Sequence, residues 1–152
     1  MIRGVHHVAI STPSIDRLLP FYRDLIGMEV VMEFGWKQGS AEIDQLVGLR
    51  DSAARQMMLK TANLCVELFE YHSPTPEPMD PRRPVCNHGH THICFDVVDI
   101  YAVYDRMVEA GVEFHTPVKD FGNIRATYGR DPDGNVFEIQ ELMRPEDPAH
   151  VF

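Results

Sequence analysis

The segment His7-Val8-Ala9-Ile10 has a counterpart in the second half of the chain, His92-Ile93-Cys94-Phe95, which lies 85 residues later (92 − 7 = 85). In both segments a histidine opens a short apolar run of the kind that forms a β-strand. A polar turn and an amphipathic, helix-like stretch follow each of them. The chain is therefore expected to consist of two similar halves, with a histidine at the corresponding place in each.

Each half ends on a further strand-like segment that carries a carboxylate between apolar neighbours. These segments are Val66-Glu67-Leu68-Phe69 and Phe137-Glu138-Ile139-Gln140. A lone carboxylate in apolar surroundings is costly unless it is paired or bound to a cation. Imidazole and carboxylate groups are ligands for divalent ions, and two of each leave coordination positions for water or substrate. The repeat predicts one divalent metal ion with four protein ligands, His7, Glu67, His92 and Glu138.

Each of these four residues also has an ordinary structural explanation when it is taken alone. A histidine at the start of a strand is usually a surface residue or a hydrogen-bonded core residue, and a glutamate in such a run usually faces solvent. The same pairing occurs twice at corresponding places, which favours the joint metal site.

Hydrophobic periodicity predicts the order strand–helix–strand–strand–strand in the first half. The strands are expected at residues 5–10, 28–34, 56–60 and 63–71, and the helix at residues 15–26. Pro20 falls inside this helix, so the helix should begin late or bend there. Residues 35–50 contain three glycines and mixed polarity and are expected to form a loop.

The second half repeats this order. Its strands are expected at residues 90–97, 112–115, 123–129 and 136–142, and its helix at residues 100–108, with Asp99 as N-cap. The two glutamates lie 71 residues apart (138 − 67 = 71), so the first half carries 14 extra residues (85 − 71 = 14). The natural place for them is the stretch 35–50, as a loop near the mouth of a cavity.

Length and composition suit one globular domain with a sizeable core, since the chain has 152 residues and is 44% hydrophobic. Prolines crowd the stretch 73–84 and predict a linker. We therefore expect a single domain with module one at about 4–72, a linker at 73–87, module two at about 88–143 and a tail at 144–152.

Charge and cysteine content narrow the class of partner and the compartment. The net charge of −9 argues against nucleic acid and anionic membranes as partners, because both require basic surfaces. Three cysteines without a CxxC pair, no signal-peptide pattern and no long apolar run favour a reduced, cytoplasmic protein.

These motifs resemble those of the vicinal oxygen chelate superfamily, which includes glyoxalase I, methylmalonyl-CoA epimerase, bleomycin- and fosfomycin-resistance proteins and extradiol dioxygenases. The resemblance runs from about Val5 to Glu141. It rests on five segments: 7–10, 21–28, 66–68, 91–93 and 131–138. It implies an α+β fold in which two βαβββ modules form a cupped, mixed sheet around a metal. It also implies that the metal ligands fall on His7, Glu67, His92 and Glu138.

Glu67 distinguishes between the chemistries of this superfamily. In the superfamily that this chain resembles, the dioxygenase and fosfomycin-resistance branches use three metal ligands and have no carboxylate ligand at the position of Glu67. The glyoxalase and epimerase branches have a fourth ligand there. The resemblance thus implies a metal-dependent lyase or isomerase, in which the ion chelates two neighbouring oxygens of a small substrate. The enzyme would abstract a proton next to a carbonyl, with Glu138 as the expected base and Glu67 as the other candidate.

Two alternatives stay open, as does the assembly. The protein could be a metal-free ligand-binding or resistance protein of the same fold, or an Fe(II) extradiol-type dioxygenase. The substrate is not named by the sequence, and zinc, nickel, cobalt, manganese and iron are not distinguished. A homodimer is expected, because edge strands near residues 5–10 and 91–95 would otherwise leave backbone groups unpaired. The metal site could then lie within one chain or across the dimer interface.

Overall fold

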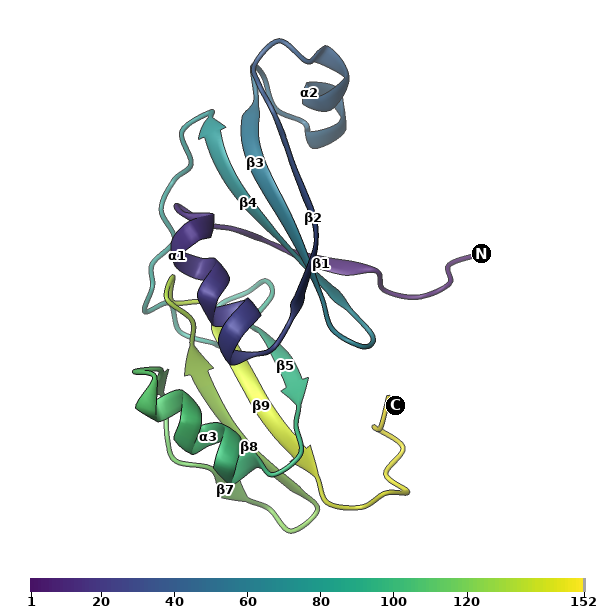
Figure 1. Ribbon diagram of the computed structural model, residues 1–152, viewed down its shortest axis with the longest axis vertical. Coiled ribbons are helices and arrows are strands. Elements are labelled where there is room, and N and C mark those ends of the chain that lie inside the picture. The colour runs from purple at the N-terminus through teal and green to yellow at the C-terminus, as the bar shows by residue number, and fades with distance from the viewer. Residues whose placement is uncertain (152) are drawn as a thin grey trace. The chain divides into compact units, whose positions relative to one another are not determined.

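The computed structural model describes residues 1–151, and the chain divides into two compact units, Met1–Pro78 and Met79–Phe152. The division falls inside the proline-rich stretch expected to be a linker. The predicted tail 144–152 extends to Phe152, which lies outside the described residues. Within residues 1–151, no helix has the length and apolar character needed to cross a membrane. Each unit is described by itself below, and Figure 1 labels most of the elements.

The first unit is built on a four-stranded sheet with the order β1-β4-β3-β2. The first strand is parallel to its neighbour β4, and the other pairs are antiparallel. The strands are β1 (His7–Ser11), β2 (Glu29–Trp36), β3 (Ala53–Lys60) and β4 (Cys65–Ser73). The helices are α1 (Ile15–Pro20), the π-helix η1 (Phe21–Leu25) and α2 (Ala41–Val47).

The second unit repeats this topology in a sheet with the order β5-β9-β8-β6. Its first strand, β5, is parallel to its last, β9, as β1 is to β4. The elements are β5 (His92–Asp96), α3 (Ile100–Glu109), β6 (Glu113–Phe114), β7 (Lys119–Asp120), β8 (Ile124–Arg130) and β9 (Val136–Leu142). The short strand β7, which pairs with β8, was not expected from the sequence. The predicted α+β class with two βαβββ modules is confirmed.

The core of each unit lies between a helix and one face of its sheet. In the first unit α1 contacts β4, and in the second α3 contacts β9. Side chains with no exposed surface occupy these interfaces: Ile15, Leu18, Leu59, Val66 and Leu68 in the first unit, and Ile100, Met107 and Ile139 in the second. Since side chains alternate along a strand, the residues between these core positions on β4 and β9 point to the other face.

A glutamate from the last strand holds the start of the main helix in both units. The carboxylate of Glu70 accepts a hydrogen bond from the N–H of Ile15 at 2.8 Å, and that of Glu141 accepts one from the N–H of Asp99 at 2.8 Å. Each of these glutamates lies three positions beyond the glutamate predicted as a metal ligand. A carboxylate at a helix N-terminus satisfies free N–H groups and favours the helix dipole.

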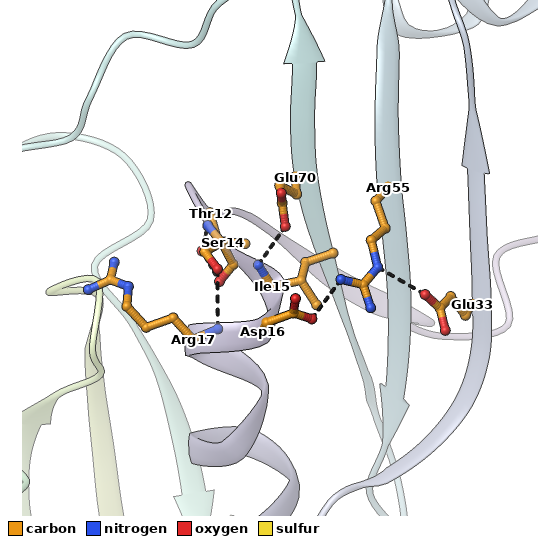
Figure 2. A network of polar contacts seen from close by, with 8 residues as sticks. All are labelled: Thr12, Ser14, Ile15, Asp16, Arg17, Glu33, Arg55 and Glu70. Atoms are coloured by element: carbon orange, nitrogen blue, oxygen red, sulfur yellow. Dashed lines mark hydrogen bonds and ion pairs between the residues drawn. The ribbon is translucent and has the colours of Figure 1, made fainter.

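Further polar contacts surround this helix start in the first unit (Figure 2). Ser14 caps α1 by accepting a hydrogen bond from the N–H of Arg17. The guanidinium of Arg55 on β3 binds Asp16 of α1 at 2.7 Å and Glu33 of β2 at 2.9 Å. The helix is therefore tied to the sheet at its N-terminal end, on the face opposite the histidine of β1.

Pro20 changes the geometry of the first helix. The α-helix begins at Ile15 and ends at Pro20, and the chain continues as the π-helix η1. Proline has no N–H to donate within the helix, so the regular ladder is interrupted there. The wider turn is closed by the N–H of Ile26, which bonds the carbonyl of Phe21 at 3.0 Å. Gly27, with φ of 86°, then ends the segment.

The prediction of a loop at residues 35–50 is wrong, because this stretch contains the end of β2 and the helix α2. The position of the extra residues is nevertheless as expected. The first unit needs 46 residues from His7 to the start of β3 (53 − 7 = 46), and the second needs 32 from His92 to the start of β8 (124 − 92 = 32). All 14 extra residues of the first unit thus precede β3 (46 − 32 = 14). The helix escaped detection because none of its side chains is buried, so it lacks an apolar stripe.

Candidate metal centre

His7 and Glu67 face each other on neighbouring parallel strands. The register of β1 and β4 sets His7 opposite Cys65 and Ala9 opposite Glu67, so the two predicted ligands lie diagonally on one face. His7 Nε2 is 3.4 Å from Glu67 Oε2. Glu67 is buried, with 7% of its surface exposed. The strand pairing therefore joins a histidine and a buried carboxylate 60 residues apart (67 − 7 = 60).

His92 and Glu138 form the corresponding pair in the second unit. The register of β5 and β9 sets Cys94 opposite Glu138, just as Ala9 stands opposite the first glutamate. His92 Nε2 is 3.1 Å from Glu138 Oε2, and the glutamate side chain is 14% exposed. Both units thus present the same diagonal His–Glu arrangement, at the four positions that the sequence repeat singles out.

The second ring nitrogen of each histidine has a polar neighbour of its own. His7 Nδ1 lies 2.9 Å from Nδ1 of His6, and His92 Nδ1 lies 2.8 Å from the hydroxyl of Thr91. A partner at Nδ1 orients the ring and leaves Nε2 for a ligand or a metal. In both histidines, Nε2 is the nitrogen that faces the carboxylate.

Glu67 has a further partner that sequence reasoning missed. The side-chain amide of Gln56, on β3, donates a hydrogen bond to Glu67 Oε1. Gln56 is itself buried, with 8% exposed. The only signal in the sequence is a single amide beside two methionines in a strand-like run, and such a residue gives no indication of its partner until the register of β3 against β4 is known.

Glu138 has different neighbours, a phenol and a thiol. The hydroxyl of Tyr128 hydrogen-bonds Glu138, and burial together with that carboxylate raises the pKa of Tyr128. The Tyr128 ring also packs edge-on against His92, with ring centroids 4.9 Å apart. Burial, and then the charge of Glu138, raise the pKa of Cys94 to about 12. Both groups are therefore neutral hydrogen-bond donors at neutral pH, and Cys94 is not a reactive thiolate.

Aromatic side chains cover the same face of the first sheet beyond Glu67. Trp36 packs against Phe69 and Tyr71 with ring centroids 6.1 and 6.0 Å apart, and Phe69 stacks on Tyr71 at 5.6 Å. Burial and the charge of Glu67 raise the pKa of Tyr71. An apolar, aromatic surface thus adjoins the first His–Glu pair.

The structure brings the predicted ligands together as two pairs. Within residues 1–151, no group of three or more histidine, cysteine, aspartate or glutamate side chains gathers as a metal site. The pairing of His7 with Glu67 and of His92 with Glu138 is a feature of the structure, whereas their joint action on one ion stays a prediction. The donor chemistry fits a divalent ion, because each pair offers one imidazole nitrogen and one carboxylate oxygen that already face each other.

The sequence matches the glyoxalase/bleomycin resistance protein/dioxygenase superfamily over residues 4–139. The chain belongs to this superfamily. The matched region contains both His–Glu pairs, and the resemblance drawn from the sequence motifs is confirmed. Members of this superfamily include lyases, epimerases and fosfomycin resistance proteins.

Two enzymes are among the relatives in sequence. The chain is 29% identical over 150 residues to the lactoylglutathione lyase of Pseudomonas aeruginosa, an alignment that covers 88% of this chain and 80% of that protein. It is 27% identical over 118 residues to the ethylmalonyl-CoA/methylmalonyl-CoA epimerase of Cereibacter sphaeroides, covering 73% of each.

Solved structures show the same fold. A glyoxalase family protein from Bacillus cereus superposes with a TM-score of 0.86 at 21% identity, covering 95% of this chain and 97% of that one. The fosfomycin resistance protein FosX from Listeria monocytogenes, complexed with Mn(II) and sulfate, gives a TM-score of 0.63 at 17% identity, covering 93% of each. Divalent metal binding therefore occurs among proteins of this fold.

Proposed function

We propose that this protein is a divalent-metal-dependent lyase or isomerase that abstracts a proton next to the carbonyl of a small oxygenated substrate. The observation that carries the proposal is the duplicated His–Glu pair, set on corresponding strands of both units. The kinship with a lyase and an epimerase supports the choice of proton-transfer chemistry, and Glu67 supplies the fourth ligand that this chemistry employs within the superfamily.

In this proposal one ion is held by four groups, Nε2 of His7 and His92 and the carboxylates of Glu67 and Glu138. Two neutral imidazoles and two carboxylates balance the charge of a divalent cation. The contacts at Nδ1 of both histidines support the assignment, since metal-ligating histidines usually have such a partner. When bound, the ion would supply Lewis-acid polarisation of the substrate carbonyl.

Glu138 is the proposed base, because its neighbours differ from those of Glu67. Glu67 holds an amide on one oxygen and faces His7 with the other. Glu138 instead lies among neutral donors, the hydroxyl of Tyr128 and the thiol of Cys94. These donors orient the carboxylate while its charge remains available to accept a proton. The aromatic surface around Trp36 would contact the apolar part of the substrate and exclude water from it.

The compartment of the protein and the class of its substrate are part of the proposal. All three cysteines are free, and the thiol of Cys86 is exposed. Free, exposed thiols persist in a reducing environment, so we place the protein in the cytoplasm. Its substrate would be a small molecule with neighbouring oxygens.

Elemental analysis of untagged protein tests the metal site. Wild type should carry stoichiometric divalent metal, and Glu67→Ala and His92→Ala should each lose most of it. His72→Ala is the matched control, since His72 is an exposed histidine on the same strand as Glu67 and should leave metal content unchanged. Full occupancy in both site variants would refute the ligand assignment.

Activity measurements separate the proposed chemistry from its alternatives. Wild type should exchange the α-proton of α-oxygenated thioesters or hemithioacetals with deuterium from solvent. A metal-free, inert protein that still binds such ligands would instead be a binding protein. Oxygen consumption with a catechol would establish the dioxygenase.

A further inference from the structure

The side chain of Gln56 is a buried amide, and the backbone pairing of the sheet does not involve it. It lies on β3 opposite Phe69 of β4, two positions beyond Glu67, so its side chain projects onto the same face as the His–Glu pair. Only 8% of Gln56 is exposed. Burying an amide is unfavourable unless it is hydrogen-bonded, and here the bond is made to Oε1 of Glu67.

This contact defines which oxygen of Glu67 is available. The strand fixes the glutamate backbone, but the side chain still has three rotatable bonds of its own. With Oε1 bound to the amide of Gln56, Oε2 is the oxygen directed at His7, 3.4 Å from Nε2. A carboxylate held through one oxygen presents the other as a preorganised ligand.

The second unit has no amide at the corresponding position. Gln56 pairs with Phe69, which lies two positions after Glu67. In the second unit the corresponding residue is Ala126, which pairs with Gln140, two positions after Glu138. Alanine has no hydrogen-bonding side chain, so Glu138 has no amide partner from that position and has the phenol of Tyr128 and the thiol of Cys94 beside it instead. The duplicated sites are therefore unequal at a position that the sequence repeat alone does not single out.

We propose that Gln56 is a positioning residue that holds Glu67 as a one-oxygen metal ligand and restricts it to that role. The inference rests on the proposed metal site and deepens it, since it assigns different tasks to the two carboxylates. The glutamate that the amide of Gln56 holds is the ligand with a fixed orientation, and Glu138, which has no such amide partner, is the base.

Metal affinity measured on substituted protein tests this proposal. Gln56→Met keeps the length of the side chain and removes the donor. Its affinity for Mn²⁺, followed by electron paramagnetic resonance, should fall about 10–100-fold, the usual cost of removing an outer hydrogen bond to a ligand. When Co²⁺ is bound in place of Mn²⁺, the visible absorption spectrum of Gln56→Met should differ from that of wild type, because the substitution changes how Glu67 coordinates the ion.

A matched control separates positioning from stability. Thr127→Val removes another buried polar contact, the 2.7 Å hydrogen bond from Thr127 to the carbonyl of Thr116, on the second unit. It should lower the melting temperature of the metal-free protein without changing Mn²⁺ affinity. Gln56→Asn keeps an amide but draws it back by one methylene, so it should weaken binding as Gln56→Met does, and it serves if the methionine variant fails to fold.

The outcomes of these measurements are distinct. Wild-type affinity and an unchanged Co²⁺ spectrum in the Gln56 variants would overturn the positioning role while leaving the metal site intact. Failure of wild type to bind either ion would overturn the metal site itself, and the role of Gln56 with it.

Discussion

Replacing Glu138 by glutamine should greatly slow proton transfer while leaving the fold and part of the metal binding in place. The substitution keeps the size of the side chain. An amide oxygen can still face His92, which lies 3.1 Å from the carboxylate in the native protein. An amide cannot accept a proton from carbon at neutral pH, so the chemistry is removed while the geometry persists.

The magnitude follows from the role assigned to Glu138. General-base catalysis is worth about 10²–10⁴-fold in rate, which corresponds to roughly 2.7–5.4 kcal/mol in the activation free energy. Glu67→Gln should cost less, because Glu67 is proposed as a ligand rather than as the base, and an amide oxygen can replace a ligand oxygen. Glu138→Gln should also retain more metal than Glu138→Ala, which has no oxygen to offer.

Exchange of the substrate α-proton into deuterated water reports this step directly, and metal content measured on the same samples separates binding from catalysis. The rate per bound metal should fall sharply in Glu138→Gln and only slightly in Glu67→Gln. Equal, small losses in the two variants would refute the assignment and place the base elsewhere.

Three further predictions concern stability and assembly. Gly129→Ala should destabilise the second unit by about 1–3 kcal/mol in urea unfolding, because the added Cβ would lie 2.5 Å from Cζ of the buried Phe137 ring; wild-type stability would contradict the packing described. Hydrogen bonds from Ser52 lower the pKa of Asp44, so the contribution of this carboxylate to stability is present above its ordinary pKa and is lost as the pH falls through the depressed value. Fluorescence of Trp36, whose indole donates to the same Ser52 hydroxyl, should report that loss, and Asp44→Asn should abolish its pH dependence. The strands β1 and β5 lie at the edges of their own sheets, and this predicts a homodimer. A monomer in sedimentation at high protein concentration would contradict the prediction.

Much of the fold and the ligand pairs could be predicted from sequence because the signals are local. Alternating apolar residues mark β4 and β9, and the turn before Val136 marks the start of its strand, so the repeat of elements can be found without knowing any long-range contact. The repeat also identified His7 and Glu67 as corresponding to His92 and Glu138, since similar motifs in the same order in two halves can be found by comparison along the chain alone.

Tertiary structure alone decided what surrounds each glutamate. The amide of Gln56 reaches Glu67, and the phenol of Tyr128 reaches Glu138, because of the register between antiparallel strands. Register depends on how the whole sheet buries its apolar face, and a shift by one residue would turn every side chain to the opposite side. The helix α2 likewise depends on contacts such as that of Asp44 with Ser52 rather than on an apolar stripe. The sequence thus singled out the two histidines and the two glutamates, while the pairing of strands determined which side chains contact each glutamate.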